Sequence, residues 1–430
     1  MASLAFSALV QLGLLCIIGS FFFLVIKKYE STLQIVVFNQ SKKSVEKKIA
    51  EAVTGNKFVM KKIREYHQPM FTKSLVPEKK AVNASESCKF WSVVTTINAP
   101  TTLIKQLSGL YPKICTVVVG DKKSRGDDEY VPLHVTFLSY EKQVQINTQF
   151  VKHTPPNHFS RKNIGFIYAI TRGAEKILDI DDDNELINLD KFDVLLKQEN
   201  FTNYLEMADY HFVDNTYLPF SDPNTIVWPR GFPLEEIIPG YEQQSKKKYN
   251  IVQSSPRVIQ YLQQVNPDFD AIYRLTNTLP FNFKVDKEDK CVILKKNSFC
   301  PFNAQSTLFY KDAFPLMLLP KTVHGRVSDI WRSYFIETIL YSKNQTVSFC
   351  SPLVNHIRNQ HNIIRDFDAE QPLYMKSYEL LQFLSKFQLK SINILEKIEE
   401  LYITMYEYGI IELEDIEYLI YWIKEIAPYL

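Results

Sequence analysis

The sequence predicts an α/β fold in which a mostly parallel sheet is flanked by helices. An N-terminal transmembrane helix is expected before it and a C-terminal α-helical region after it. Three observations support this prediction. Between residues 90 and 180, short apolar runs rich in β-branched residues alternate with helical patterns, as in parallel sheets with helices on both faces. Residues 4–26 carry no charge, which suits a membrane span. From about residue 371 onward the pattern is that of amphipathic helix.

Length and composition bound the organisation. The chain has 430 residues, enough for one large domain or two. Its net charge of +2 gives no reason to expect a nucleic acid as partner. Aromatic residues make up 13% of the chain and only 12 residues are Gly, which favours a well-filled globular core. We therefore expect a membrane anchor, a lysine-rich stem, an α/β domain and a helical region at residues 1–28, 29–87, 88–370 and 371–430.

The uncharged stretch 4–26 is longer than the apolar core of a cleaved secretory signal, so we expect an uncleaved signal-anchor and a single-pass membrane protein. Its orientation has two interpretations. Lys27 and Lys28 follow the span, and the positive-inside rule would then place the bulk of the chain in the cytosol. Four N-x-S/T triplets are weak evidence for a lumenal chain, because such triplets also arise by chance; they begin at Asn39, Asn83, Asn200 and Asn344.

Cysteine usage is compatible with either orientation. Cys16 lies in the expected span, and the remaining Cys residues show no metal-binding spacing. In a lumenal domain, one option is a disulfide that joins Cys300 to Cys291 or to Cys350. Buried free thiols are the alternative.

The α/β domain begins at residue 90 with a strand that extends to residue 97. A turn and helix start at 98–102 follow, then expected strands at 114–121 and 133–138 and an expected helix at 161–175 that leads into an acidic strand. Ligands of such sheets bind at the carboxyl ends of the strands. The loop at 98–102, the Gly-Asp pair that ends the second strand, and the acidic residues near 180 all fall at such ends. Farther on, 254–276 predicts a helix, a turn and then a strand from residue 271.

Four carboxylates stand close together at the end of the acidic strand, at Asp179, Asp181, Asp182 and Asp183. Such a cluster repels itself strongly unless it is hydrated or neutralised by a cation. Oxygen-only ligands suit Mg²⁺ or Mn²⁺ rather than zinc, so we expect a site for one of these ions. The alternative is a solvated acidic turn that caps the next element.

Residues at neighbouring strand ends and at the start of the 161–175 helix could bind a nucleotide sugar. Asn98 lies in the first such loop, and Asp121 could hydrogen-bond a base or ribose, or be an ordinary turn residue. Arg161 and Lys162 could meet phosphate, directly or through the helix amino terminus, or be solvated helix charges. Asn163 could allow the helix to approach the nucleotide, or merely pack.

Transfer with inversion would also need a carboxylate base for the acceptor hydroxyl. Asp329 is the candidate, in the first turn of a helix that Ser328 would cap; helix-start stabilisation is the alternative. Trp331 and Arg332 could line the acceptor side, or belong to core and surface. A local ion pair is expected among Asp268, Asp270 and Arg274.

Several separate stretches resemble one family, the STELLO-like glycosyltransferases, long described as a domain of unknown function. They occur in the family's order between about residues 90 and 340. The pieces are W-S-V-V-T-T-I-N-A-P-T, V-V-V-G-D, R-K-N-I-G-F-I-Y-A-I-T-R-G-A-E-K-I-L-D-I-D-D-D-N, W-P-R-G-F-P-L-E, D-F-D-A-I-Y-R-L-T, P-F-N-A-Q-S-T-L-F and R-V-S-D-I-W-R-S-Y. The resemblance implies the nucleotide-sugar transferase fold called GT-A, a membrane anchor and a catalytic domain in the Golgi lumen, which favours the lumenal orientation.

This sequence departs from the family pattern at the acidic strand. There the family often has D-A-D-D-R-G, whereas Asp183 and Asn184 stand here in place of Arg-Gly. The closer match to the family favours Asp179, Asp181 and Asp182 as metal ligands. A D-x-D pattern would instead use Asp181 and Asp183.

Together these features predict a metal-dependent glycosyltransferase. It would use Mn²⁺ or Mg²⁺ to bind a nucleotide sugar, for which a UDP-sugar is expected first, and transfer the sugar to a glycan or glycoprotein acceptor in the Golgi lumen. The helices after residue 371 are expected to pack on the domain or to form a homo-oligomer. The alternative is a catalytically inactive GT-A-like scaffold that assembles or traffics other membrane proteins.

Overall fold

The computed structural model describes residues 88–124, 127–146, 148–187, 202–243, 248–284 and 291–430. The expected membrane anchor and stem lie outside these residues, so both stay predictions. Among the helices of the described residues, none combines the length and the apolar character that a membrane crossing requires.

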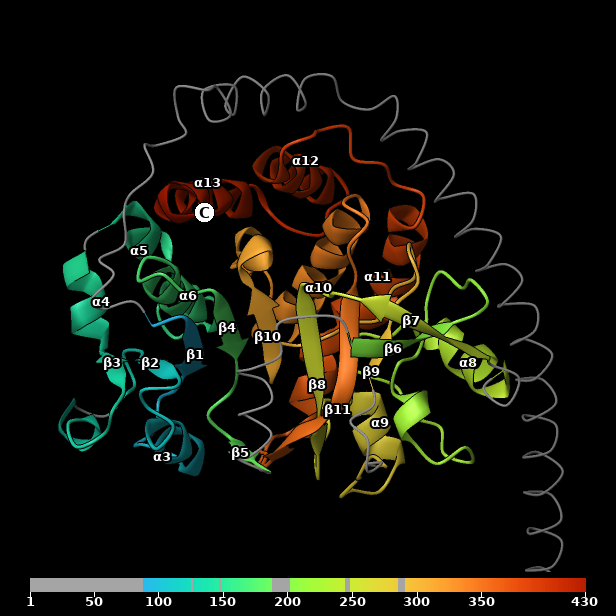
Figure 1. Cartoon of the computed structure of the whole chain (residues 1–430), viewed down its shortest axis with the longest axis horizontal. Helices are drawn as coiled ribbons and strands as arrows, with labels where there is room; N and C mark the ends of the chain where they lie inside the picture. The colour runs from blue at the N-terminus through green and yellow to red at the C-terminus, as the bar shows by residue number, and fades with distance from the viewer. Residues whose placement is uncertain (1–87, 125–126, 147, 188–201, 244–247, 285–290) are drawn as a thin grey trace, which may run out of the picture. The chain divides into compact units, whose positions relative to one another are not determined.

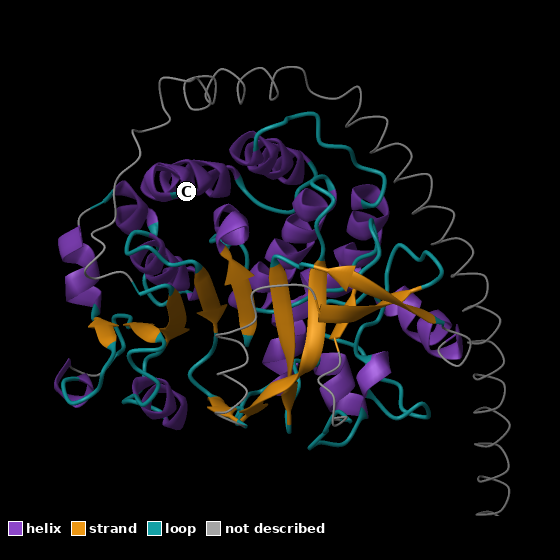
Figure 2. Ribbon diagram, viewed as in Figure 1, coloured by secondary structure: helices purple, strands orange, loops and turns teal. Residues whose placement is uncertain are grey.

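The first half of the sheet is parallel, as the sequence predicts. Its strands are β1 (Phe90–Thr95), β2 (Cys115–Val119), β3 (Thr136–Leu138) and β4 (Lys176–Asp179), in the order β3-β2-β1-β4. Connections that cover a parallel sheet leave its strands buried on both faces, and β1 is buried over nearly all its length. In Figure 2 the strands run as one band across the middle of the picture, with helices above and below it.

The second half is mixed, so the prediction of a mostly parallel sheet is wrong. The order continues β10-β8-β11-β9-β6-β7, and β10 is antiparallel to both β4 and β8. Parallel pairs (β8 with β11, β9 with β6) alternate there with antiparallel ones. The bounds are β5 (Asn184–Leu186), β6 (Thr202–Met207), β7 (Tyr249–Ser254), β8 (Val258–Gln264), β9 (Cys291–Ile293), β10 (Thr307–Tyr310) and β11 (Val347–His356).

Residues 254–276 reverse the predicted order of elements. The expected helix is strand β8, and the expected strand from Ala271 is the short helix α9 (Ala271–Thr276). The helix was expected because Gln260 and Gln263 interrupt the apolar residues, as the polar side of a helix would. Both are buried in the middle of the sheet, where their amides donate to the carbonyl oxygen of Gln305.

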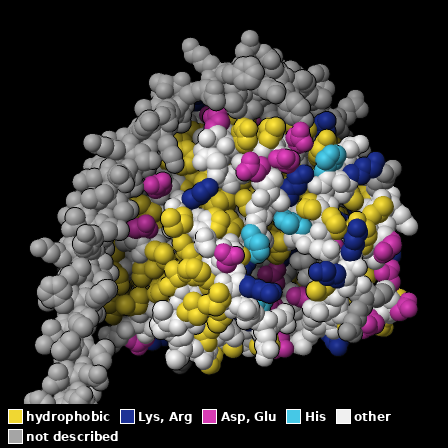
Figure 3. Space-filling view, turned by 180° about the vertical axis from the view of Figure 1, so that it is seen from behind, with side chains coloured by type: hydrophobic (Ala, Val, Ile, Leu, Met, Phe, Trp, Pro, Cys, Tyr) yellow, Lys and Arg dark blue, Asp and Glu magenta, His cyan; other side chains and the backbone are white. Residues whose placement is uncertain are grey.

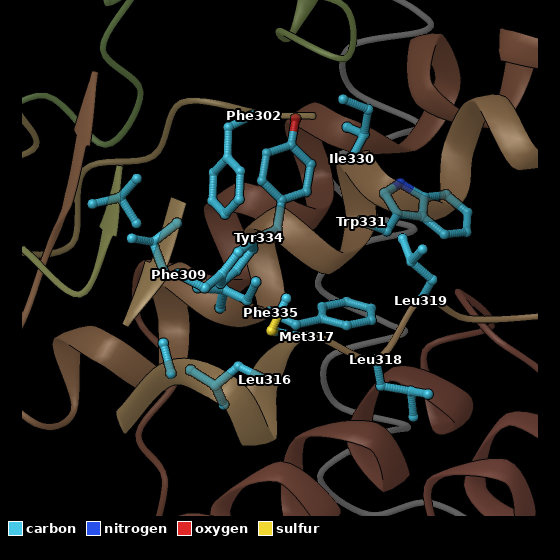
Figure 4. Packing of buried hydrophobic residues seen from close by; sticks show 14 of the residues in the cluster. Phe302, Phe309, Leu316, Met317, Leu318, Leu319, Ile330, Trp331, Tyr334 and Phe335 are labelled. Atoms are coloured by element: carbon cyan, nitrogen blue, oxygen red, sulfur yellow. The ribbon is translucent and has the colours of Figure 1, made fainter. Parts of the chain in front are cut away.

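Two apolar clusters cover the two faces of the sheet, as alternation along a strand requires. Ile177 of β4 belongs to the larger cluster and Leu178 to the smaller one. Figure 4 shows part of the larger cluster, where Trp331 and Phe335 of α10 (Gly325–Tyr341) face Leu319 and Met317. Trp331 is therefore core.

Helix α6 (Lys162–Ile170) lies directly on β1 and β2. A Cβ at Gly165 would stand 2.5 Å from Val93 Cγ1 and 2.8 Å from Val119 Cγ2, so only Gly allows this approach. The helix is shorter than the expected 161–175, and Gly173 follows it with a positive φ of 84°. Before α10 the described residues also form α3 (Thr102–Ser108), α4 (Tyr140–Ile146), α5 (Gln149–His153) and α8 (Ile237–Gln243).

The C-terminal region is helical, as predicted, with α11 (Ile363–Leu384), α12 (Ile394–Glu407) and α13 (Leu413–Ile426) (Figure 1). The predicted boundary at residue 371 falls inside α11. The apolar stripe of α12 packs within the chain, since Tyr402 contacts Phe335 at 5.6 Å between ring centroids. From α13, Tyr418 stacks on Phe150 at 4.4 Å. Homo-oligomerisation through these helices stays a prediction.

Two disulfides differ from those expected. Cys88 bonds to Cys115, and Cys291 bonds to Cys350. The second pair is explained by sheet register, because antiparallel β9 and β11 place Cys291 directly opposite Cys350. Both predicted pairings of Cys300 are wrong; its thiol is free, buried and hydrogen-bonded with the Thr216 hydroxyl.

Candidate functional site

The carboxyl ends of β1 and β4 open onto a hollow of about 170 Å³. We call it the acidic hollow. Its walls come from the loop after β1, the turn after β4, and the loop after β11: Asn98, Thr101, Thr102, Asp182, Asp183, Asn184, Glu185, Ile357 and Asn359. The site therefore lies where the parallel half of the sheet was expected to bind a ligand.

Asp182 and Asp183 both face this hollow. Asp182 Oδ2 accepts hydrogen bonds from Thr96 Oγ1 at 2.5 Å and from Asn98 Nδ2 at 3.1 Å, while burial raises the pKa of Asp182. Asp183 Oδ2 lies 3.1 Å from His356 Nε2. Within the described residues, Oδ1 of each carboxylate accepts no hydrogen bond.

His356 is a site residue that the sequence did not reveal. It ends β11, and its Nδ1 lies 2.6 Å from the carbonyl oxygen of Asn266. A carbonyl can only accept, so Nδ1 carries the hydrogen and Nε2 of a neutral ring presents a lone pair to the Asp183 carboxylate. Two acceptors 3.1 Å apart need a proton or a cation between them. A histidine whose other nitrogen donates to a backbone carbonyl is the usual arrangement of a metal-binding imidazole.

Asp179 lies on the opposite side of the strand end, in a buried ion-pair triad. Its Oδ1 is 2.6 Å from Lys162 Nζ and its Oδ2 is 3.0 Å from Arg332 Nη2, and all three side chains are buried. Both oxygens face protein cations rather than the acidic hollow. This geometry gives Asp179 the role of joining β4 to α6 and α10, and it makes Arg332 an internal residue.

Asp181 stands between the triad and the hollow. Its Oδ1 accepts from Lys162 Nζ at 2.6 Å, and the same ammonium donates to the carbonyl oxygen of Ala304 at 2.8 Å. Burial tends to lower the pKa of Lys162, but Asp179 and Asp181 outweigh it and hold that pKa above its ordinary value. Burial raises the pKa of Asp181 to about 7, against the opposing effect of Lys162.

Charge is unbalanced around this strand end. The carboxylates of Asp179, Asp181, Asp182 and Asp183 outnumber the cations of Lys162 and Arg332. The excess of negative charge favours protons or a divalent cation. No three His, Cys, Asp or Glu side chains among the described residues are arranged to enclose a metal by themselves. Mg²⁺ is usually held in another way, by one or two carboxylates together with the phosphates of a substrate, and Asp182 and Asp183 fit that mode.

The other residues expected to bind the nucleotide divide into two groups. Asn98 and Asp121 lie at the strand ends and are partly or fully exposed. Arg161 is buried instead, where its Nη1 donates to the carbonyl oxygen of Thr154 and its guanidinium lies 3.9 Å from Asp121. Asn163 uses both ends of its amide on the backbone of Leu319, at 2.9 Å each. Arg161 therefore supports Asp121, and Asn163 packs.

Asp329, the candidate base, is held in a buried fork. Arg230 donates to Oδ1 at 3.1 Å and to Oδ2 at 2.9 Å, and the backbone N–H of Ala304 also donates to Oδ2. Its helix is capped by His324, whose side chain accepts from the backbone N–H of Arg326, so the expectation that Ser328 is the cap is wrong. Asp329 is therefore the partner of Arg230 in an internal ion pair, which is neither of the two roles expected from the sequence, and its role as a base stays a prediction.

Arg230 also binds Asp268, which replaces the expected pairing of Asp268 with Arg274. Burial would raise the pKa of Asp268, but the Arg230 guanidinium outweighs it and holds that pKa well below its usual range. Asp270 caps α9 by accepting from the backbone N–H of Tyr273, and burial raises its pKa to about 6. Charged and His side chains lie close together near the centre of the face in Figure 3.

Comparison with known proteins confirms the resemblance seen in the motifs. The family model of the STELLO glycosyltransferases matches residues 326–428, which run from the start of α10 to the end of α13. The chain is similar to "Probable glycosyltransferase STELLO2" of Arabidopsis thaliana, with 29% identity over 364 residues. It is also similar to "Probable glycosyltransferase STELLO1" of the same plant, with 27% identity over 364 residues. Each alignment covers 82% of this chain and 46% of the relative, so the chain spans about half the length of these relatives.

Proposed function

We propose that this chain, which resembles the STELLO glycosyltransferases, transfers a sugar from a nucleotide-sugar donor, first of all a UDP-sugar, to a glycan or glycoprotein acceptor. One observation carries the proposal. Asp182 and Asp183 each have a carboxylate oxygen without a hydrogen-bond partner among the described residues, and both line a hollow at the carboxyl ends of β1 and β4, where a sheet of this kind binds its ligand. The similarity to proteins named as glycosyltransferases supports the reaction class, and the parallel order β3-β2-β1-β4 supports a GT-A-like nucleotide-binding half.

In this proposal Asp182 and Asp183 hold Mn²⁺ or Mg²⁺ together with the donor diphosphate, Asp181 lies next to them, and His356 orients Asp183 through its contact with Oδ2. When bound, the ion would neutralise the diphosphate of the donor and so stabilise it as a leaving group. Asn98 and Asp121 bind the nucleoside part from the loops after β1 and β2. Thr96 and Asn98 orient Asp182 through hydrogen bonds to its Oδ2.

The triad of Lys162, Asp179 and Arg332 holds the strand end in place without contacting the donor. Asn184 completes the turn after β4, because its Nδ2 donates to the carbonyl oxygen of Asp181 at 2.9 Å and its Oδ1 accepts from Gln305. A carboxylate ligand positioned by such internal bonds needs little reorganisation when the ion binds.

A Golgi-lumenal location behind an N-terminal anchor is part of the same proposal. Disulfides persist in oxidising compartments and are rare in the cytosol. The pairs Cys88–Cys115 and Cys291–Cys350 therefore favour a lumenal domain over the cytosolic one that Lys27 and Lys28 suggest.

One observation favours the second candidate function, an inactive scaffold. Asp329 is occupied by Arg230, which leaves the expected catalytic base engaged in an internal ion pair. A scaffold would keep its role in assembling or trafficking membrane proteins when Asp183 is replaced by Asn, whereas an enzyme would lose donor binding.

The test is the thermal stability of the purified full chain with and without Mn²⁺ and a panel of nucleoside diphosphates. A ligand at about 100 times its dissociation constant stabilises the folded state by about 2.7 kcal/mol, which is a readily measured shift. We expect a shift with one nucleotide that requires the metal. If the folded protein shows no shift with any nucleotide, the scaffold function replaces the enzyme.

A further inference from the structure

Asn344 stands at the tip of the turn between α10 and β11, in the triplet Asn344-Gln345-Thr346. Of the four N-x-S/T triplets, it is the one that lies wholly within the described residues. Its side chain is exposed, and its φ of 54° is a left-handed value that Asn tolerates better than most residues.

Backbone hydrogen bonds stabilise the turn, whereas the Asn344 side chain contributes little to it. The backbone N–H of Asn344 donates to the carbonyl oxygen of Tyr341, and that of Gln345 donates to Leu340. The Asn344 side chain makes one surface contact, an Oδ1 that accepts from the exposed Lys296 ammonium at 2.8 Å. Such a contact is weak in water and is readily given up.

A bulky group on Asn344 would not reach the acidic hollow. The hollow is lined by Ile357 and Asn359, which follow the carboxyl end of β11, whereas Asn344 precedes the amino end of that strand. A strand of 10 residues separates its ends by roughly 30 Å, at a rise of about 3.3 Å per residue. The exposed neighbours Ser342 and Lys343 leave open space around the turn.

An independent feature next to the turn points to the compartment in which such triplets are modified. Cys350 lies on the strand that begins at Val347 and is bonded to Cys291 of the adjacent β9. This disulfide needs the oxidising lumen of the secretory pathway, where Asn-linked glycans are also attached. We infer that Asn344 carries an N-linked glycan, an inference that rests on the proposed lumenal location.

The modification would be a transfer by the cell's own oligosaccharyltransferase from a polyprenyl-diphosphate-linked oligosaccharide. A bond forms between Asn344 Nδ2 and the anomeric carbon of the first sugar. The bond from that carbon to the diphosphate oxygen breaks, the lipid diphosphate leaves with the electron pair, and the amide loses one proton to solvent.

The test expresses the full chain in cells with a secretory pathway and counts N-glycans by enzymatic removal and intact mass. Asn344→Gln and Thr346→Val should each carry one glycan fewer than the wild type, whereas Thr346→Ser, which keeps the triplet, should match it. Donor-dependent thermal stabilisation should be unchanged in Asn344→Gln, since the turn is remote from the acidic hollow.

A reporter separates failure of this inference from failure of the lumenal location. Lys390→Asn together with Ile392→Thr creates a new triplet in the loop between α11 and α12, where Ile392 is 93% exposed. If the reporter gains a glycan while wild type and Asn344→Gln carry equal numbers, Asn344 is not modified. If neither Asn344 nor the reporter is modified, the lumenal location is wrong and the inference fails with it.

Discussion

Asp179 lies in a buried ion-pair triad, whereas Asp183 faces the acidic hollow. Single substitutions of these two residues should therefore have different effects on stability and on ligand binding. Asp179→Asn removes the negative charge that lies between Lys162 and Arg332, both of which are buried. Breaking a buried ion pair by removing one partner costs about 3–5 kcal/mol, because an uncompensated charge stays in a low-dielectric interior. Asp183→Asn acts on a carboxylate that is 19% exposed and should cost about 1 kcal/mol or less.

Differential scanning calorimetry of the full chain gives the comparison. For a domain of this size, the loss in Asp179→Asn corresponds to a midpoint that is lower by roughly 4–7 °C. Asp183→Asn should melt within about 2 °C of the wild type and yet lose Mn²⁺-dependent stabilisation by nucleotide. The double variant Asp179→Asn with Arg332→Met is the control for the pairing, since its cost should be well below the sum of the two single costs.

The reasoning is refuted if Asp179→Asn melts like the wild type but no longer responds to metal and nucleotide. Asp179 would then be a ligand, as the family pattern suggested, and the buried triad would carry no weight in stability.

Three further predictions test the site, the C-terminal helices and the packing of α6. His356→Ala should weaken Mn²⁺ binding about 10–100-fold in a calorimetric titration, and an affinity equal to that of the wild type would remove His356 from the site. Burial raises the pKa of the fully buried Asp415 to about 6, so this residue adds stability below pH 4 that is lost as pH rises through 6. Relative to Asp415→Asn, the wild type should therefore gain about 2 kcal/mol of unfolding free energy between pH 7 and pH 4; parallel pH curves in denaturant titrations would contradict this. Gly165→Ala should cost about 1–3 kcal/mol by overpacking against Val93, whereas Gly240→Ala, where nothing lies within 4 Å, should be neutral or slightly stabilising; equal midpoints for the two would refute the close approach of α6.

The sequence predicts the parallel half of the sheet well because its strands are apolar on both faces and alternate with helices. It fails at β8 because two buried glutamines imitate a helical pattern. Only the folded structure shows that the amide nitrogens of both donate to a backbone carbonyl inside the sheet. The mixed second half could not be predicted, because its strand order does not follow a repeated unit of strand and helix.

The candidate site shows the same limits. Adjacency in sequence suggests that the four aspartates act together. Because side chains alternate along β4, Asp179 lies on the same face as Ile177, which α6 and α10 cover. Asp182 and Asp183 follow in the turn and face the acidic hollow. His356 is distant in sequence and meets Asp183 only because β11 pairs with β5, directly after the acidic turn. No local sequence pattern predicts a contact between residues so far apart in the chain. For Asp329, the position near the start of a helix suggests a base, but the sequence does not reveal that Arg230 binds both carboxylate oxygens.

The most direct test of the proposed activity is turnover of nucleotide sugars by the purified full chain. Release of nucleoside diphosphate would be followed with a panel of donors, with Mn²⁺ or a chelator, in the wild type and in Asp183→Asn. We expect one donor class to be consumed only with the metal, and the activity to be lost in Asp183→Asn although that variant stays folded. Equal release by wild type and Asp183→Asn, or no release and no binding with any donor, would contradict a metal-dependent glycosyltransferase.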